Sequence, residues 1–193
     1  DYPSWYMRNG GSVLSTTIDK YIYISCRDLP PFFEHKFRFV WSKMENVKSI
    51  NQIQHKAVRH MLHYFKIKNG LEIHYDGDLP ARSGMGSSSV FVVGLMNLLY
   101  NFKRKKISKK ILAQKSIHFE QKILKEIVGS QDQIAAAYGG FNKIIFKTDG
   151  KFNIRPINIK KKVLQQLNNN LVLVYTGLAR TAHDIAKSYI KKL

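Results

Sequence analysis

The feature that most constrains the fold is a run of apolar residues, VFVVGLMNLL, at positions 90–99. At helical spacing this run is apolar on almost every side, so a helix predicted from about Ser88 to Tyr100 has no polar face to turn toward water. The run contains Gly94 and Asn97 and is too short to span a bilayer. The sequence therefore predicts a central helix that other elements cover on all sides.

The segments around this helix mix strand and helix patterns without the strict alternation of a doubly wound sheet, which places the chain in the α+β class. β-branched or alternating stretches predict one or two strands in 12–26 and single strands at 37–42, 71–76, 141–147, 152–158 and 171–176. Apolar residues at helical spacing predict helices at 52–66, 108–127 with Ser108 as N-cap, 130–140, 160–168 and from about Ala179 to the end.

The length of 193 residues suits one domain, or one domain with part of another. Composition changes at three successive asparagines, Asn168 to Asn170, and we expect a boundary there between domains at 1–168 and 169–193. The chain starts at Asp1 and stops inside an amphipathic pattern, so we expect a piece of a longer protein.

The chain is strongly basic, with 32 Lys and Arg against 13 Asp and Glu and a net charge of +19. Such a charge favours anionic partners, namely nucleic acid, a membrane surface or phosphorylated small molecules. A solvated basic face is the plainer interpretation, because the lysines accompany a general richness in Ile and Asn. The single cysteine, Cys26, excludes an internal disulfide and fits a reducing compartment. The histidines show no metal-ligand spacing.

The loop before the central helix, PARSGMGSSS at 80–89, has the local chemistry of a phosphate site. Gly84 and Gly86 let the backbone adopt positive φ and approach an anion closely, and a helix N-terminus attracts negative charge. A glycine-rich turn with serine caps and no ligand is the alternative. The loop is not a Walker A motif, since no lysine follows Gly86, and Ser89 occupies the third glycine position of a dinucleotide fingerprint.

This loop resembles the P-x-x-x-G-L-G-S-S-[AS] motif of the GHMP kinases, which include galactokinase, homoserine kinase, mevalonate kinase and phosphomevalonate kinase. Met85 stands where the motif usually has leucine. The resemblance implies that the loop wraps the triphosphate of ATP, although Arg82 could equally be a surface arginine. The ATP-binding residues expected from it are Arg82, Ser83, Gly84, Met85, Gly86, Ser87, Ser88 and Ser89.

A second segment, GSQDQ at 129–133, resembles the G-x-x-D-[QN] segment that carries the catalytic aspartate in this family. Transfer of a phosphoryl group to a hydroxyl needs a base and a metal that offsets phosphate charge. We expect Asp132 to be the base, with Glu120 and Ser88 as the protein ligands of Mg²⁺. The alternatives are a dipole-stabilising role for Asp132 in the first helical turn, and a solvated helix charge at Glu120.

The N-terminal stretch resembles the segment that follows the first motif of sugar kinases in the family, which implies that Asp1 bonds sugar hydroxyls. Gly129, Gln131 and Asp132 are expected beside it in the substrate site. Arg180 follows Thr176-Gly177 and is expected to face a sugar phosphate, with a solvated charge as the alternative.

Taken together, these motifs are most similar to those of GHMP kinases that act on D-glycero-D-manno-heptose 7-phosphate. The resemblance implies an N-terminal domain of the ribosomal protein S5 domain 2-like fold, followed by only the start of a ferredoxin-like C-terminal domain. It also implies a cytoplasmic bacterial enzyme that uses ATP and Mg²⁺ to phosphorylate the anomeric hydroxyl, giving the 1,7-bisphosphate for GDP-heptose and surface polysaccharide.

Several alternatives to this function remain open. The acceptor could be that of another GHMP kinase, such as galactose, fucose or mevalonate, and the piece could be catalytically idle. A basic nucleic-acid-binding domain is less expected, because no recognised RNA-binding motif is present. The expected partners are therefore ATP and a sugar phosphate, without a membrane, and homodimer formation is left open.

Overall fold

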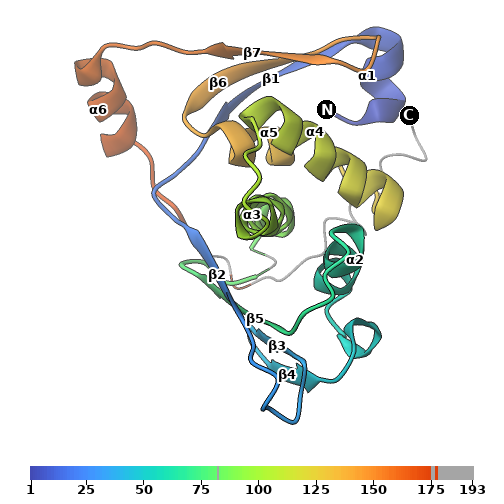
Figure 1. Ribbon diagram of the computed structural model, residues 1–193. Helices are drawn as coiled ribbons and strands as arrows, with labels where there is room; N and C mark the ends of the chain where they lie inside the picture. The colour runs from blue at the N-terminus through green and yellow to red at the C-terminus, as the bar shows by residue number, and fades with distance from the viewer. Residues whose placement is uncertain (82, 175–176, 178–193) are drawn as a thin grey trace.

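The computed structural model describes residues 1–81, 83–174 and 177, and Figure 1 shows two sheets with helices between them. The three-stranded sheet is antiparallel and has the order β1 (Gly11–Thr16), β6 (Phe141–Phe146), β7 (Phe152–Pro156). The four-stranded sheet has the order β2 (Ile22–Asp28), β5 (Leu71–Gly77), β3 (Phe37–Val40), β4 (Met44–Val47). Only the β3–β5 pair of that sheet is parallel. The mixed α+β class is confirmed.

Helices occupy about half of the remaining described chain. They are α1 (Pro3–Asn9), α2 (Lys56–Tyr64), α3 (Ser87–Phe102), α4 (Lys109–His118), α5 (Gln131–Tyr138) and α6 (Lys161–Asn169), with a 3₁₀ turn at Ile50–Gln52 and a π-helical turn, η2, at Phe119–Ile123. The predicted cap of α4 is confirmed, because the Ser108 hydroxyl accepts a hydrogen bond from the backbone N–H of Ile111 at 3.3 Å. None of the helices among the described residues has the length and apolar character needed to cross a membrane.

Helix α3 lies between the two sheets, as its all-round apolar sequence predicts (Figure 1). Leu95, Met96 and Leu99 have no exposed surface at all. One side of α3 packs on the four-stranded sheet and α2 within the larger apolar cluster. A second cluster joins α4, α5 and α1 to the three-stranded sheet through Ala113, Ile134 and their neighbours. The central helix belongs to the first cluster, and it contacts α4 and α5, which contribute residues to the second.

The single helix predicted for 108–127 is wrong beyond His118. The chain widens into η2, in which the Leu124 N–H bonds to the Phe119 carbonyl five residues earlier at 2.9 Å. The helical pattern predicts a buried stripe of Leu112, Ser116, Phe119, Ile123 and Ile127, and burial follows it as far as Phe119. Burial then shifts by one residue, so that Glu120 and Leu124 are buried and Ile123 is only partly covered. A π turn inserts one residue into the helical repeat, which accounts for this shift.

Two other differences separate the expected elements from the structure, and one expected element lies outside the described residues. Residues 171–174 form no strand and are exposed, so the buried strand predicted there is wrong over those residues. The helix predicted from Ala179 and the ferredoxin-like start lie outside the described residues. Strand β4 and helix α1 were not predicted, because a four-residue strand and a seven-residue helix carry too few repeats to show a period.

Candidate active site

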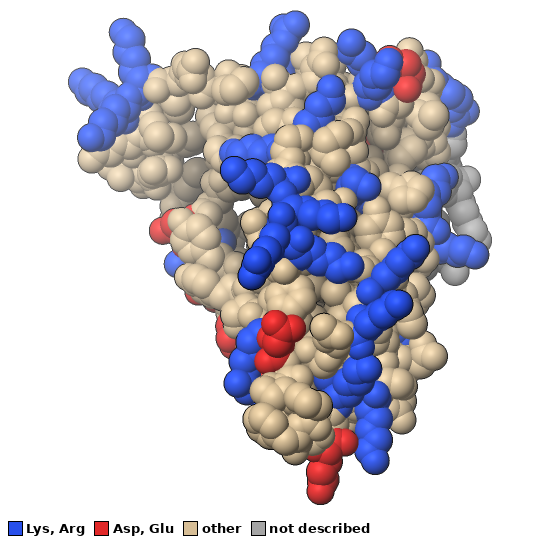
Figure 2. Space-filling model, in the orientation of Figure 1, with Lys and Arg blue, Asp and Glu red and all other residues tan. Residues whose placement is uncertain are grey.

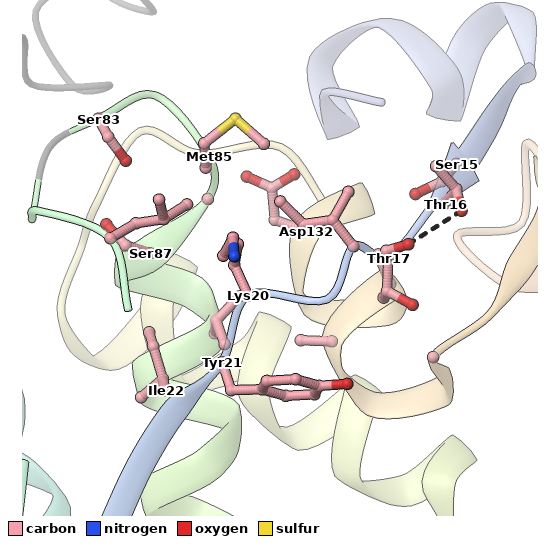
Figure 3. A pocket seen from close by; sticks show the side chains of 17 residues that line it. Ser15, Thr16, Thr17, Lys20, Tyr21, Ile22, Ser83, Met85, Ser87 and Asp132 are labelled. Carbon is pink, nitrogen blue, oxygen red and sulfur yellow. Dashed lines mark hydrogen bonds between the residues drawn. The ribbon is translucent and has the colours of Figure 1, made fainter. Parts of the chain in front are cut away.

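A cavity of about 450 Å³ opens at the N-terminus of α3. Three segments wall it, namely residues 15–22 around the β1–β2 connection, residues 79–90 of the loop and first turn of α3, and the inner face of α5 with Gly139. Figure 3 shows Asp132 on one side of this cavity and Ser83, Met85 and Ser87 of the loop on another. Two parts of the sequence that lie about fifty residues apart therefore meet at one site.

The loop has the backbone conformation that its glycines predict. Gly84 has φ of +81° and Gly86 has φ of +72°, and Gly86 is the N-cap of α3. No side chain caps that helix, so the serine-capped turn is not what the structure shows. The Ser83 hydroxyl is buried beside the cavity without a hydrogen-bond partner among the described residues. An uncapped helix start and an unpartnered hydroxyl leave donors free for an anionic ligand.

Asp132 lies in the first turn of α5 and its carboxylate packs directly against the loop. A Cβ added at Gly86 would lie 3.1 Å from Asp132 Oδ2, so only glycine leaves this space free. Burial raises the pKa of Asp132, and a hydrogen bond with Gln131 opposes that rise. The charge of Asp132 in turn adds to the burial that raises the pKa of Tyr2. The site thus holds a carboxylate of increased basicity against the phosphate-type loop.

Glu120 is completely buried behind this wall, which excludes the alternative of a solvated helix charge. Its carboxylate accepts hydrogen bonds from the Ser89 hydroxyl at 3.1 Å and from the Gln133 side-chain amide. Burial raises the pKa of Glu120 to about 7, against the lowering effect of these two bonds. Glu120 therefore contacts Ser89. Ser88, in contrast, is exposed, makes no hydrogen bond with Glu120 and does not line the cavity.

The donor chemistry around Glu120 fits Mg²⁺, which takes oxygen ligands and is often held by few protein groups. The carboxylate has no cationic partner among the described residues, and the Gln133 Oε1 atom beside it is buried without a hydrogen-bond partner there. A cation would relieve the cost of burying this charge. The roles of Glu120 and Ser88 as metal ligands remain predictions.

Asp1 lies against residues 129–131, as the sequence predicts. Its carboxylate accepts a hydrogen bond from the Gln131 backbone N–H at 3.0 Å, and its carbonyl accepts one from Ser130 at 3.1 Å. The Asp1 carboxylate lies so close to Gly129 that a Cβ at position 129 would overlap it. Asp1, Gly129 and Gln131 are therefore neighbours, although their contact with a sugar is untested. Arg82 and Arg180 lie outside the described residues.

Sequence reasoning missed the contribution of residues 15–22, which supply seven of the lining residues, among them Thr17, Lys20 and Tyr21. The segment carries no glycine-rich or carboxylate motif that would have singled it out. Its only signal is the loss of strand alternation between the two strands predicted in 12–26, which marks the connection but not what the connection faces.

Several known proteins are similar to this chain. The chain is 31% identical over 121 residues to D-glycero-alpha-D-manno-heptose 7-phosphate kinase of Campylobacter jejuni. The aligned region covers 63% of this chain and 36% of that protein. It is also 31% identical over 114 residues to the galactokinase of Pyrococcus furiosus, covering 58% of the chain and 30% of the relative. The chain thus spans about a third of the length of these curated relatives.

The solved structure of a D-glycero-D-manno-heptose 1-phosphate kinase from Bacteroides thetaiotaomicron has the same fold, with a TM-score of 0.74 and 22% sequence identity. The match covers 84% of this chain and 56% of that one. The family described as GHMP kinases N terminal domain matches residues 51–140, a range that includes the glycine–serine loop, Glu120 and Asp132. Residues 51–140 of the chain therefore match a GHMP kinase N-terminal domain.

Proposed function

We propose that this chain is the ATP-binding part of a sugar kinase that transfers a phosphoryl group to the anomeric hydroxyl of D-glycero-D-manno-heptose 7-phosphate. The product would be the 1,7-bisphosphate, which serves GDP-heptose and surface polysaccharide synthesis. The observation that carries the proposal is the position of the Asp132 carboxylate beside Gly86 in the wall of one cavity, where a Cβ built at Gly86 would lie 3.1 Å from Asp132 Oδ2. It brings a base and a phosphate-type loop within the reach of one reacting hydroxyl.

The chemistry assigned to the chain's own groups follows from this contact. The loop amides and the Ser83 and Ser87 hydroxyls hold the phosphates, and the N-terminus of α3 adds a favourable potential. Asp132 accepts the proton of the acceptor hydroxyl as the oxygen attacks phosphorus. Its raised pKa makes it a stronger base than an exposed aspartate. Mg²⁺, if held by Glu120, would neutralise phosphate charge, whereas the exposed position of Ser88 does not support its predicted role beside Glu120.

The acceptor is the part of the proposal that depends on the relatives. The heptose 7-phosphate kinase and the galactokinase match over similar lengths and at the same identity. The two differ in the sugar that their names give, so galactose is the second acceptor to test. Figure 2 shows lysine and arginine side chains spread widely over the visible face, with few carboxylates among them. Such a surface suits anionic substrates in general and does not select one.

The test is ADP release by the purified full-length protein with ATP, Mg²⁺ and a panel of heptose 7-phosphate, galactose, fucose and mevalonate. Heptose 7-phosphate should give the highest kcat/KM. Asp132→Asn should lower kcat by roughly 10²- to 10⁴-fold, because the variant cannot take up the proton. The matched control Asp149→Asn changes an exposed carboxylate in the β6–β7 turn and should keep full activity.

Full turnover by Asp132→Asn would refute the assignment of the base. A different preferred acceptor would refute the substrate but leave the kinase chemistry standing. Salt-sensitive RNA binding tighter than micromolar, without turnover of any acceptor, would favour the nucleic-acid alternative instead.

A further inference from the structure

The loop that faces the cavity contains no lysine after Gly86, although other phosphate-binding loops carry one there. A nucleoside triphosphate brings several negative charges, and backbone amides alone neutralise them only in part. Among the described residues that line the cavity, Lys20 is the single cation and Asp132 the single carboxylate. The loop sequence does contain Arg82, so the question is whether the fold supplies from elsewhere the lysine that is missing after Gly86.

Lys20 lies on the β1–β2 connection, which is fixed at both ends to the walls of the site. On one side, the Thr17 N–H donates to the Gly140 carbonyl at 3.1 Å and the Gly140 N–H donates to the Thr17 hydroxyl at 2.9 Å. Gly140 follows α5, the helix that carries Asp132. The connection is thereby held in place relative to the base.

The other end of the connection is tied to the start of the loop. The Tyr21 N–H donates to Asp78 Oδ2 at 2.8 Å, and the Asp78 N–H donates to the Tyr21 carbonyl at 2.9 Å. Asp78 precedes the loop by a few residues. These two pairs of bonds hold Lys20 between the phosphate-type loop and Asp132. They use the backbone of the connection and the Thr17 hydroxyl, and they leave the lysine side chain free.

The Lys20 side chain has the freedom that a ligand contact requires. It is exposed, and within the described residues its ammonium makes neither an ion pair nor a hydrogen bond. In particular it is not paired with Asp132. Figure 3 shows the side chain rising from the connection toward the loop that carries Ser83, Met85 and Ser87. An ammonium in this position faces whatever occupies the cavity.

We propose that Lys20 binds the γ-phosphate of the nucleoside triphosphate and stabilises its charge during transfer. The inference rests on the proposed function, in which Asp132 marks the end of the cavity where the phosphoryl group leaves the nucleotide. Because Lys20 shares that cavity with Asp132 and the loop, its ammonium serves the terminal phosphate. The lysine that is missing from the loop in sequence is supplied in space by the neighbouring strand connection.

The test compares two nucleotides that differ in the γ-phosphate, the non-hydrolysable analogue AMP-PNP and ADP, each with Mg²⁺ and the full-length protein in a calorimetric titration. Lys20→Met should weaken AMP-PNP binding about tenfold or more, as expected for loss of a charge-assisted hydrogen bond, and should change ADP affinity less than about twofold. Lys20→Arg should restore most of the AMP-PNP affinity. The control Lys43→Met removes an exposed lysine from the β3–β4 turn and should change neither.

Equal affinity of wild type and Lys20→Met for AMP-PNP would overturn the inference, and so would equal losses for AMP-PNP and ADP. Unchanged thermal unfolding of Lys20→Met would show that the variant is folded, as its exposure leads us to expect. The assay needs no sugar, so it separates the two proposals. A wild-type protein that binds AMP-PNP but phosphorylates no acceptor fails the sugar kinase proposal while still testing Lys20, and one that binds no nucleotide fails both.

Discussion

Replacing Glu120 by glutamine should stabilise the protein in alkaline solution and leave it almost unchanged in acid. The pKa of this carboxyl rises on folding from an ordinary 4.5 to about 7, chiefly because the group is fully buried. As the pH increases, the unfolded chain therefore loses the proton first. The stability that the protonated carboxyl contributes is complete below about pH 4.5 and is lost as the pH rises through 7.

The size of the effect follows from the two pKa values. Each pKa unit corresponds to about 1.4 kcal/mol, so above pH 8 the buried carboxylate costs about 3 kcal/mol of unfolding free energy. Glu120→Gln removes this titration and keeps the shape of the side chain. The new amide can accept from Ser89. Once the Gln133 side-chain amide turns over, the new amide can also donate to Gln133 Oε1, which has no partner among the described residues. Its gain should be up to about 3 kcal/mol at pH 8.5 and below about 1 kcal/mol at pH 5.

The assay is urea unfolding followed by circular dichroism at both pH values, with EDTA and without nucleotide. Glu34→Gln is the matched control, because that exposed side chain should change stability by less than about 0.5 kcal/mol at either pH. A gain for Glu120→Gln that is the same at pH 5 and pH 8.5 would show that the carboxyl does not titrate between these values. The reasoning from burial would then fail.

Two further substitutions test the walls of the site and its support. Gly86→Ala should lower stability by about 1–2 kcal/mol, since φ is +72°, and should also weaken nucleotide binding, because relief of this strain and of the contact with Asp132 distorts the loop that holds the phosphates. Gly11→Ala, which meets only ordinary contacts, is its control, and equal behaviour of the two in unfolding and titration would argue against the close contact. Ser108→Ala should lower the free energy of unfolding by about 1 kcal/mol in a denaturant titration, because α4 loses its cap. Nucleotide affinity should not change, and a lower affinity would show that the effect reaches beyond the end of the helix.

The parts of the site that depend on local sequence could be predicted. The positive φ of Gly84 and Gly86 follows from the residue type, and the central position of α3 follows from its apolar composition. The position of Asp132 in a first helical turn follows in the same way. Each of these properties is decided within a few residues of the chain, where propensity and periodicity act.

The parts that depend on packing could not be predicted. Nothing near Lys20 in sequence indicates the cavity it faces, because the opposite wall comes from residues 79–90 and α5. The partner of Glu120 is Ser89 rather than Ser88 because of the turn at η2 and the rotation of α3, neither of which has a sequence signal. The apolar residues 171–174 have strand composition, yet they are exposed and unpaired in the described chain.

The π turn at η2 gives the segment between α4 and α5 an unusual sensitivity to length. The extra residue changes the phase of the buried side chains. Leu112 and Ser116 are among the buried positions in α4, and Glu120 and Leu124 are among those after the turn begins. Deleting one residue there would return the chain to the ordinary helical phase and rotate Glu120 by about 100° away from Ser89. Exchanging an exposed residue such as Lys122 leaves the phase intact. The number of residues in this turn is therefore under tighter physical constraint than the identity of those that face water.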